Sequence, residues 1–132
     1  MVTSMMVMNN IDSYYTYDYQ ANREDLDELA RVVYLEAGSQ GKECMQAVAS
    51  VIVNRVESDI FPNTIHEVIH QNGQYSTADA SCSDVSQEAY SVAYSVIRFG
   101  SMIPEGVLYQ RCKRPVKGTK LWKCINGEYF SM

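Results

Sequence analysis

The sequence predicts an α+β domain that is mainly helical and ends in a small antiparallel sheet. Apolar residues recur at helical spacing in four segments between residues 22 and 99. The segment after residue 100 carries turn signals and short runs typical of strands. A chain of 132 residues with 46% hydrophobic residues can bury a sizeable core, so we expect residues 21–132 to form one domain.

The N-terminal stretch, residues 1–20, is rich in Tyr, Met and Asn and follows neither a helical nor a strand period. We expect an arm that is either disordered or docked onto the domain through its tyrosines. It has no basic region followed by an apolar stretch, so it is not predicted to be a secretory signal. No apolar run in the sequence approaches the length of a membrane span. The sequence leaves the export route open.

The first helix is expected to begin near Asn22 or Asp25 and to end at Gly38. Acidic residues in its first turns match the positive end of the helix dipole. A single apolar stripe at helical spacing gives the helix one buried face. The stripe consists of Leu26, Leu29, Ala30, Val33 and Ala37.

The second expected helix, residues 42–57, is apolar nearly all round. A helix without a wide polar face is buried, so this helix is predicted to be the central one. Its polar positions form only a narrow seam of Gln46, Ser50, Asn54 and Glu57.

A short third helix is expected within "FPNTIHEVIHQNG". Asn63 or Thr64 can cap its N-terminus, and the Asn72-Gly73 pair is typical of a stop signal. Its core face is formed by apolar residues, which places two histidines on the opposite or flanking side. Those core residues are Ile65, Val68 and Ile69.

The remaining elements follow a polar loop over residues 76–86. A fourth helix is expected over 86–99, closed by Gly100. Short extended runs, "VLYQ", "KLWKC" and "EYF", come after it. The last two flank Asn126-Gly127, a pair that favours a tight hairpin.

The four cysteines include no CxxC pair, so zinc-finger spacing is absent. Cys44 lies in a helical apolar stretch and is expected to be a small core residue. Cys112 and Cys124 flank a basic loop and could pair in an oxidising compartment. In the absence of a secretory signal we expect free thiols.

The net charge of −5 argues against nucleic acid as a partner. Six of the eleven Lys and Arg residues nevertheless lie between Glu105 and Glu128, where there is no acid. This basic segment, 111–123, is either a solvated hairpin or a surface that meets an anionic polymer.

Residues 66–70, "HEVIH", complete the H-E-x-x-H pattern of zinc metalloproteases. A catalytic zinc needs a third protein ligand besides the two imidazoles. The chain has only two histidines, and Glu88 is the one carboxylate near a usual spacing downstream. We therefore expect His66 and His70 to be solvated residues, and we expect neither a metal nor a cofactor.

Glu36 is the carboxylate best placed for acid–base chemistry. It lies about 60° from the centre of the apolar stripe of its helix, in the last turn before Gly38. Apolar surroundings and the negative end of the helix dipole both favour the protonated carboxyl. A glycosidase uses such a group to protonate a leaving oxygen. From geometry alone, an ordinary exposed glutamate or a partner of an arginine remains the alternative.

Several ordered motifs carry a resemblance to a known family. They occur in "LARVVYLEAGSQGKECMQAVASVIVNRV" and "FPNTIHEVIHQNGQYS". The order L-A-R-x-x-Y-x-E-A, V-I-x-N-R-V, F-P-x-T and G-Q-[FY]-S resembles the cell wall hydrolase family of spore cortex-lytic enzymes, of the SleB and CwlJ type. The resemblance covers residues 26–76, thins over 77–110, and returns at "LYQ" and "INGEYF".

This resemblance implies a lysozyme-like catalytic domain that acts on peptidoglycan glycan strands at the cell wall or spore cortex. It implies cleavage between N-acetylmuramic acid and N-acetylglucosamine, commonly as a lytic transglycosylase with one catalytic glutamate. A monomer is expected. On this interpretation the zinc-protease pattern is coincidental.

The resemblance also assigns residues to the site. The residue that matches the catalytic glutamate is Glu36, and Gln46 with its polar seam is expected to orient the site rather than contact sugar. The positions expected to bind the glycan are Tyr34, Gln74, Tyr75, Ser76, Tyr109 and Glu128.

The chain departs from the family pattern at Glu128, where a G-H-x-F-like element usually has histidine. Glu128 could act as a second carboxylate, favour the protonated form of Glu36, or only alter sugar contacts. The alternatives to a transglycosylase are a hydrolysing muramidase, a non-catalytic wall-binding module that uses the basic segment, and a zinc protease.

Overall fold

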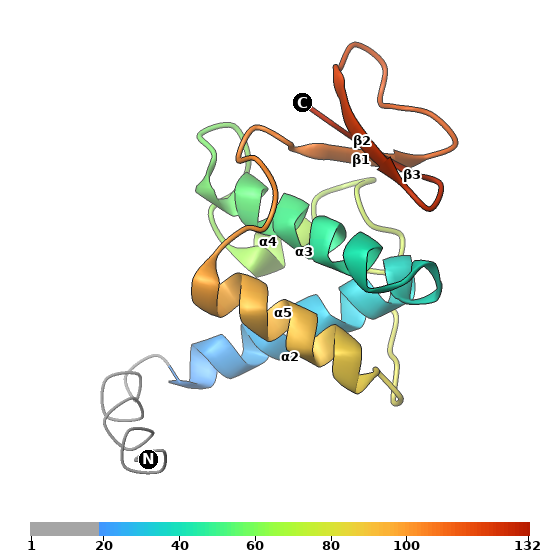
Figure 1. The fold of residues 1–132 in the computed structure, drawn as a ribbon. Helices are drawn as coiled ribbons and strands as arrows, with labels where there is room; N and C mark the ends of the chain where they lie inside the picture. Colours follow the sequence, from blue (N-terminus) through green and yellow to red (C-terminus); the bar gives the residue numbers. More distant parts are fainter. Residues whose placement is uncertain (1–18) are drawn as a thin grey trace.

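The structure is a computed structural model that describes residues 19–132. Most of the expected arm, residues 1–18, therefore lies outside the described part of the chain. Four α-helices precede a three-stranded antiparallel sheet, which confirms the predicted α+β architecture (Figure 1). The elements are α2 (Tyr19–Ala37), η2 (Gly38–Gln40), α3 (Lys42–Glu57), α4 (Ile65–Ile69), α5 (Gln87–Phe99), β1 (Tyr109–Cys112), β2 (Leu121–Ile125) and β3 (Glu128–Ser131).

Helix α2 begins at Tyr19, earlier than the expected start at Asn22 or Asp25. No glycine or proline, the two residues least tolerated in a helix, lies between Tyr19 and Asn22, so the helix extends past the capping signal. The predicted buried stripe is present, and Leu29 and Val33 are fully buried.

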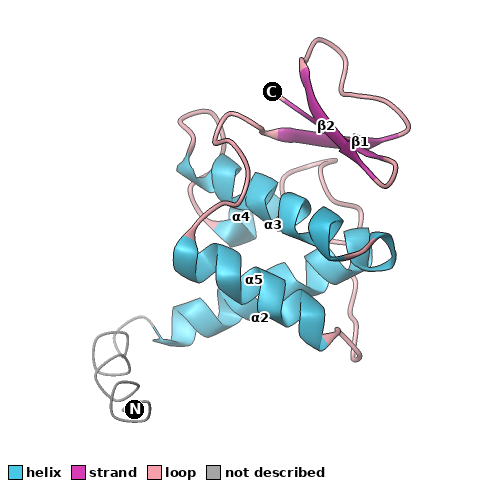
Figure 2. Ribbon diagram, in the orientation of Figure 1, coloured by secondary structure: helices cyan, strands magenta, loops and turns pink. Residues whose placement is uncertain are grey.

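Helix α3 is the most buried element, as its sequence predicts. Eleven of its residues are buried, from Cys44 to Arg55. Helices α2 and α5 pack against each other and against α3, while the sheet lies on the other side of α3 (Figures 1 and 2). The core therefore surrounds α3, and the sheet approaches it from the side that α2 and α5 leave open.

The polar seam of α3 connects this helix to the segment that leads into the sheet. The Ser50 hydroxyl accepts a hydrogen bond from the backbone N–H of Met102, at 2.9 Å. The Asn54 side chain donates to the carbonyls of Pro104 and Val107, at 2.9 and 3.0 Å. Because a buried polar group is costly without a partner, these bonds fix residues 102–107 against α3.

Hydroxyl side chains cap α4 and α5. Thr64, one of the two predicted caps of α4, accepts a hydrogen bond from the Glu67 backbone N–H. Ser86, which was not predicted as a cap, accepts one from the Ala89 backbone N–H at the start of α5. Helix α4 ends at Ile69, before the predicted stop pair.

In the sheet, β3 lies between β1 and β2. The turn between β2 and β3 has positive φ angles at Asn126 (47°) and Gly127 (90°), as the predicted tight hairpin requires.

Cys112 and Cys124 lie on the two outer strands, roughly 9–10 Å apart across β3, which is too far for a disulfide. All four cysteines are free. Among the described residues, no helix is both long and apolar enough to cross a membrane.

Replacement of Ile52 by alanine tests the central position of α3. Ile52 is fully buried, so we expect the free energy of unfolding to fall by about 2–5 kcal/mol. Urea unfolding followed by circular dichroism measures it. Ile60→Ala is the matched control, because Ile60 is 69% exposed and its replacement should change stability by about 0.5 kcal/mol or less. Equal effects of the two substitutions would contradict the central role of α3.

Candidate functional site

Glu36 lies in the last turn of α2 and is half-buried. Its Oε2 accepts a hydrogen bond from the Thr77 hydroxyl at 2.6 Å. The Thr77 segment comes from the loop after α4, so two parts of the chain 41 residues apart meet at this carboxylate. The Thr77 hydroxyl bonds to Oε2 and not to the other carboxyl oxygen, Oε1. Oε1 can therefore transfer a proton to a bound ligand.

Arg55 organises a second part of the site. Its side chain is 3% exposed and comes from the last turn of α3. It donates hydrogen bonds to the Leu108 carbonyl at 2.7 Å and to the Gln74 side chain at 2.8 Å. Its guanidinium also lies over three aromatic rings, at 4.6 to 5.9 Å from their centroids. These are the rings of Phe61, Tyr75 and Tyr109.

Tyr75 interacts with Arg55 and also with two carboxylates, Glu36 and Glu128. Its side chain is 7% exposed, and burial raises the pKa of its hydroxyl to about 12. Arg55 lowers that pKa, whereas Glu36 and Glu128 raise it, so all three charged groups act on the same phenol. The hydroxyl is buried and makes no hydrogen bond to any described residue.

Glu128 begins β3 and is only 8% exposed. The hairpin that carries it docks near the start of α3, because Asn126 donates to the Gln40 carbonyl at 2.6 Å and Lys123 pairs with Glu43 at 2.8 Å. Burial, and after it the charge of Glu36, raise the pKa of the Glu128 carboxyl above its ordinary value of 4.5. Within the described chain, its buried Oε1 has no hydrogen-bond partner.

Cys44 gives a further constraint on the position of Glu128. Burial raises the pKa of the Cys44 thiol to about 11, and Glu128 is the strongest charged contributor to that shift. Glu128 is therefore near enough to both Cys44, at the N-terminal end of α3, and Glu36 for charge interactions with each. A carboxyl in that environment is favoured in its neutral form.

The structure therefore brings together most of the residues predicted from the sequence. Glu36, Tyr75 and Glu128 influence one another electrostatically, and Gln74 and Tyr109 contact Arg55, which contacts Tyr75. Their role in binding a ligand stays a prediction.

Tyr34 and Ser76 are placed differently. The Tyr34 ring packs over Gly38, where an added Cβ would lie 2.8 Å from the ring and would force the ring to move. Tyr34 is two residues before Glu36, and side chains at that spacing point to different sides of a helix. Ser76 is exposed, between Tyr75 and Thr77.

Sequence reasoning missed Arg55 and Thr77. Arg55 could have been noticed as a cation on a helix predicted to be buried on all sides, because such a charge needs partners. Thr77 lies in a loop of mixed polar residues and offers no comparable signal. Gln46 is partly buried on α3, and the seam residues that bond to other segments are Ser50 and Asn54.

A second cluster lies at the H-E-x-x-H segment. Glu88 was the only downstream candidate for a third ligand, and no metal was expected; the carboxylate that the fold brings to the two histidines is Glu28 from α2. One ligand atom from each of Glu28, His66 and His70 lies within 4.8 Å of the others. Among the described residues, this group has the composition of a metal site.

The comparisons with known proteins follow this geometry. The sequence profile of the family described as Cell Wall Hydrolase matches residues 39–119, more than half of the chain. The chain belongs to the cell wall hydrolase family. Glu36 and Glu128 lie just outside the matched range, on either side of it. No curated protein matches the chain.

Two solved structures resemble this cell wall hydrolase. One is the catalytic domain of the Bacillus cereus SleB protein, with a TM-score of 0.74 and 26% identity over 83% of this chain and 91% of that one. The other is the catalytic domain of the germination-specific lytic transglycosylase SleB from Bacillus anthracis, with a TM-score of 0.70 and 25% identity over 82% and 93%. Family and fold together support a peptidoglycan-lytic function and confirm the resemblance inferred from the motifs.

Substitution of Glu128 by glutamine tests whether the Glu128 carboxyl keeps its proton in the folded state. The raised pKa means that the folded state keeps a proton that the unfolded state loses. Wild-type stability should therefore decline, relative to Glu128→Gln, as the pH rises from the unfolded value of 4.5 through the higher folded value. Melting temperatures between about pH 4 and about pH 8 measure this difference.

Glu57→Gln is the control for that comparison, because Glu57 is exposed. The melting temperature of Glu57→Gln is measured beside that of wild type over the same range. A Glu128→Gln variant that becomes less stable than wild type at neutral pH would show that the Glu128 carboxylate is ionised and paired.

Proposed function

We propose that this cell wall hydrolase cleaves the glycan strand of peptidoglycan between N-acetylmuramic acid and N-acetylglucosamine, as a lytic transglycosylase. Glu36 is the one catalytic acid and base. The observation that carries the proposal is the half-buried Glu36 carboxyl, bonded to Thr77 and close enough to Glu128 to alter its pKa. The SleB domain of B. anthracis, which has a similar fold, is described as a lytic transglycosylase.

In the proposed reaction, the protonated Glu36 carboxyl donates its proton to the glycosidic oxygen, and the bond from that oxygen to the muramic anomeric carbon breaks. The C6 hydroxyl of the same muramic residue attacks the anomeric carbon and closes an anhydro ring. Its proton passes to the Glu36 carboxylate, which restores the starting state. No water and no second nucleophile is consumed.

The glycan-binding residues of this proposal are those that surround the carboxylates. The Tyr75 hydroxyl and Glu128 Oε1 are buried polar atoms without a partner among the described residues, and such atoms favour hydrogen bonding to a ligand. Gln74 and Tyr109 are held by Arg55 and present polar and aromatic groups beside them. The family motifs add Ser76, next to Tyr75, and Tyr34, which points to a different side of α2 from Glu36.

The hydrolysing muramidase is the second candidate function. The environment of Glu128 argues against it. A hydrolase of this kind needs a second, ionised carboxylate to activate water or to attack the sugar. Burial and the charge of Glu36 both disfavour ionisation of Glu128. Glu128 is therefore better suited to donate a hydrogen bond than to accept a proton, which favours the transglycosylase.

The proposal extends to the organisation of the protein. Residues 21–132 act as a monomeric catalytic domain at the cell wall or spore cortex, and the chemistry does not require the part of the chain before α2. The basic segment, 111–123, is a secondary contact for the anionic wall.

Glu36→Gln is the experiment that tests the proposal. Glutamine keeps the size of the side chain and can still accept a hydrogen bond from Thr77, but it cannot deliver a proton. General acid catalysis contributes about 10²–10⁴-fold, and Glu36 also serves as base, so cleavage should fall by the upper end of that range. Turbidity loss of purified peptidoglycan measures cleavage, and co-sedimentation measures binding, which should be retained.

Glu105→Gln is the matched control, because Glu105 is exposed and is not part of the proposed site, and it should cleave at the wild-type rate. If Glu36→Gln retains substantial activity, the catalytic acid lies elsewhere. If the wild type binds peptidoglycan without cleaving it, the chain is a binding module and the proposal fails.

Thr77 is proposed to position Glu36. Thr77→Val removes the donor and keeps the shape, and loss of a hydrogen bond to a carboxylate should lower kcat about tenfold with little change in KM. Thr77→Ser keeps a hydroxyl and should restore most of the rate. Equal losses in both variants, or a change confined to KM, would assign Thr77 to loop packing instead.

A further inference from the structure

We propose that Glu28, His66 and His70 form a binding site for one divalent first-row transition metal ion, with zinc as the best match. The site is separate from Glu36, and the proposal does not depend on the cleavage chemistry. It rests on the convergence of three ligand-type side chains from two helices at one point.

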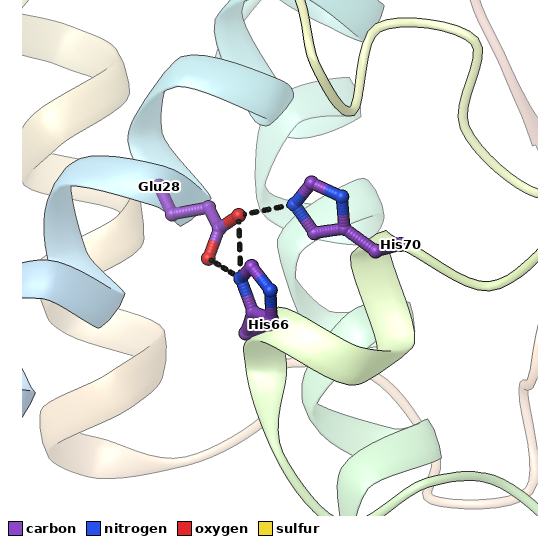
Figure 3. A group of neighbouring side chains, drawn as sticks. All are labelled: Glu28, His66 and His70. Atoms are coloured by element: carbon purple, nitrogen blue, oxygen red, sulfur yellow. Dashed lines mark hydrogen bonds and ion pairs between the residues drawn. The ribbon is translucent and has the colours of Figure 1, made fainter.

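The three side chains point toward one another. Figure 3 shows the Glu28 carboxylate, from α2, directed at the two rings that project from α4. His66 Nδ1 lies 3.1 Å from both carboxylate oxygens, and His70 Nε2 lies 2.6 Å from Oε2. The two rings are neighbours, with centroids 4.2 Å apart and planes inclined by 33°. Glu28 and His70 are partly buried, whereas His66 is 65% exposed.

These distances fit a tetrahedral ion after a small adjustment. Zinc bonds of roughly 2.0–2.2 Å to nitrogen and oxygen place neighbouring ligand atoms about 3.4 Å apart. The contacts of His66 with Glu28 are close to that separation. His70 Nε2, at 2.6 Å from Oε2, has to move away from that oxygen by about 0.8 Å. Two imidazoles and a carboxylate are ligands that zinc prefers, and they leave a fourth position for water.

The surroundings of His70 support a ligand role. Its other nitrogen, Nδ1, lies 3.3 Å from Asp79 Oδ1, so the ring is placed between two carboxylates. A neutral imidazole has one N–H and can donate to only one of them. With a metal ion on Nε2, the proton sits on Nδ1 and donates to Asp79, which is the arrangement common behind metal-bound histidines.

Arg31 holds the carboxylate side of the site in place. Its guanidinium lies 3.8 Å from Glu28 Oε2 and donates hydrogen bonds to the carbonyls of Thr77, Ala78 and Ala80. The charge of Arg31 competes with a cation for Glu28, so a moderate affinity is expected rather than a very high one.

Protease chemistry is not part of the proposal. In H-E-x-x-H proteases, the glutamate between the histidines is the general base beside the metal. Here Glu67 takes part in the N-terminal cap of α4, where its carboxylate accepts a hydrogen bond from the Thr64 hydroxyl at 3.0 Å. Glu67 is thereby engaged at the cap rather than at the cluster.

The consequence of metal binding would be structural. The ion joins α4 to α2, and Asp79 and Arg31 extend the connection to the loop 77–80, whose Thr77 holds Glu36. Binding to the folded state alone raises its stability. Glycan cleavage should need no metal, and His66→Ala and His70→Ala should cleave within a few-fold of wild type.

The test is a zinc titration of the full chain by calorimetry, together with the melting temperature at each zinc concentration. The wild type should bind one equivalent and melt at a higher temperature. Exposed thiols also bind zinc, so the titration is repeated with Cys82, Cys112 and Cys124 replaced by serine. In that background, cobalt should give the d–d bands of a tetrahedral ion without a thiolate charge-transfer band.

The variants distinguish the site from adventitious binding. Glu28→Gln, His66→Ala and His70→Ala should each weaken zinc binding by more than about 100-fold, and Asp79→Asn by about tenfold. Glu67→Gln lies within the same motif and should bind like wild type. A cooperative thermal unfolding transition in the absence of zinc shows that each variant is folded. The proposal would be overturned by equal zinc affinity in all variants. It would also be overturned if the wild type bound no zinc, since the three side chains would then form only ion pairs. The activity of Glu36→Gln has no bearing on it.

Discussion

The structure depends on the burial of α3 on every side. A helix without a wide polar face must be covered all round, and α2, α5 and the segment before the sheet provide that cover. The few polar side chains of α3 are then forced to find partners inside the protein. Ser50, Asn54 and Arg55 find them in the backbone between Met102 and Leu108. The chain that enters the sheet is therefore fixed by hydrogen bonds to α3.

This anchoring explains how a carboxylate from the end of the chain comes to face one from the beginning. The segment fixed on α3 leads into β1, β3 pairs with β1, and Glu128 is the first residue of β3. The hairpin turn is tied to the α2–α3 junction through Asn126. Glu128 and Glu36 then share a partly buried region, where two negative charges are costly and one neutral carboxyl is favoured. The proposed chemistry uses this asymmetry, with one carboxyl that exchanges protons and one that only forms hydrogen bonds.

Much of this arrangement could be predicted from local sequence signals. The buried helix, the cap at Thr64 and the hairpin at Asn126 follow from periodicity and turn chemistry that act over a few residues. Glu36 was found by combining its helical position with the family motifs. The start of α2 was misplaced, because a good capping residue does not prevent a helix from beginning earlier.

The features that the sequence did not reveal are contacts between distant segments. Thr77 meets Glu36 across 41 residues, and Glu28 meets His70 across 42. No periodic pattern encodes such pairs, since they result from the packing of α2 against α4 and the loop after it. For the same reason, spacing downstream of the histidines pointed to Glu88 as the nearest carboxylate, whereas the carboxylate that contacts them, Glu28, comes from the helix that precedes them.

The central claim is that Glu36 alone drives cleavage without the addition of water. Mass spectrometry of the glycan ends, after digestion of purified peptidoglycan in water enriched in heavy oxygen, tests it most directly. The account predicts anhydro-muramic ends that lack one water and carry no heavy oxygen. Reducing muramic ends that contain heavy oxygen would contradict it and would assign the activation of water to a second group in the site.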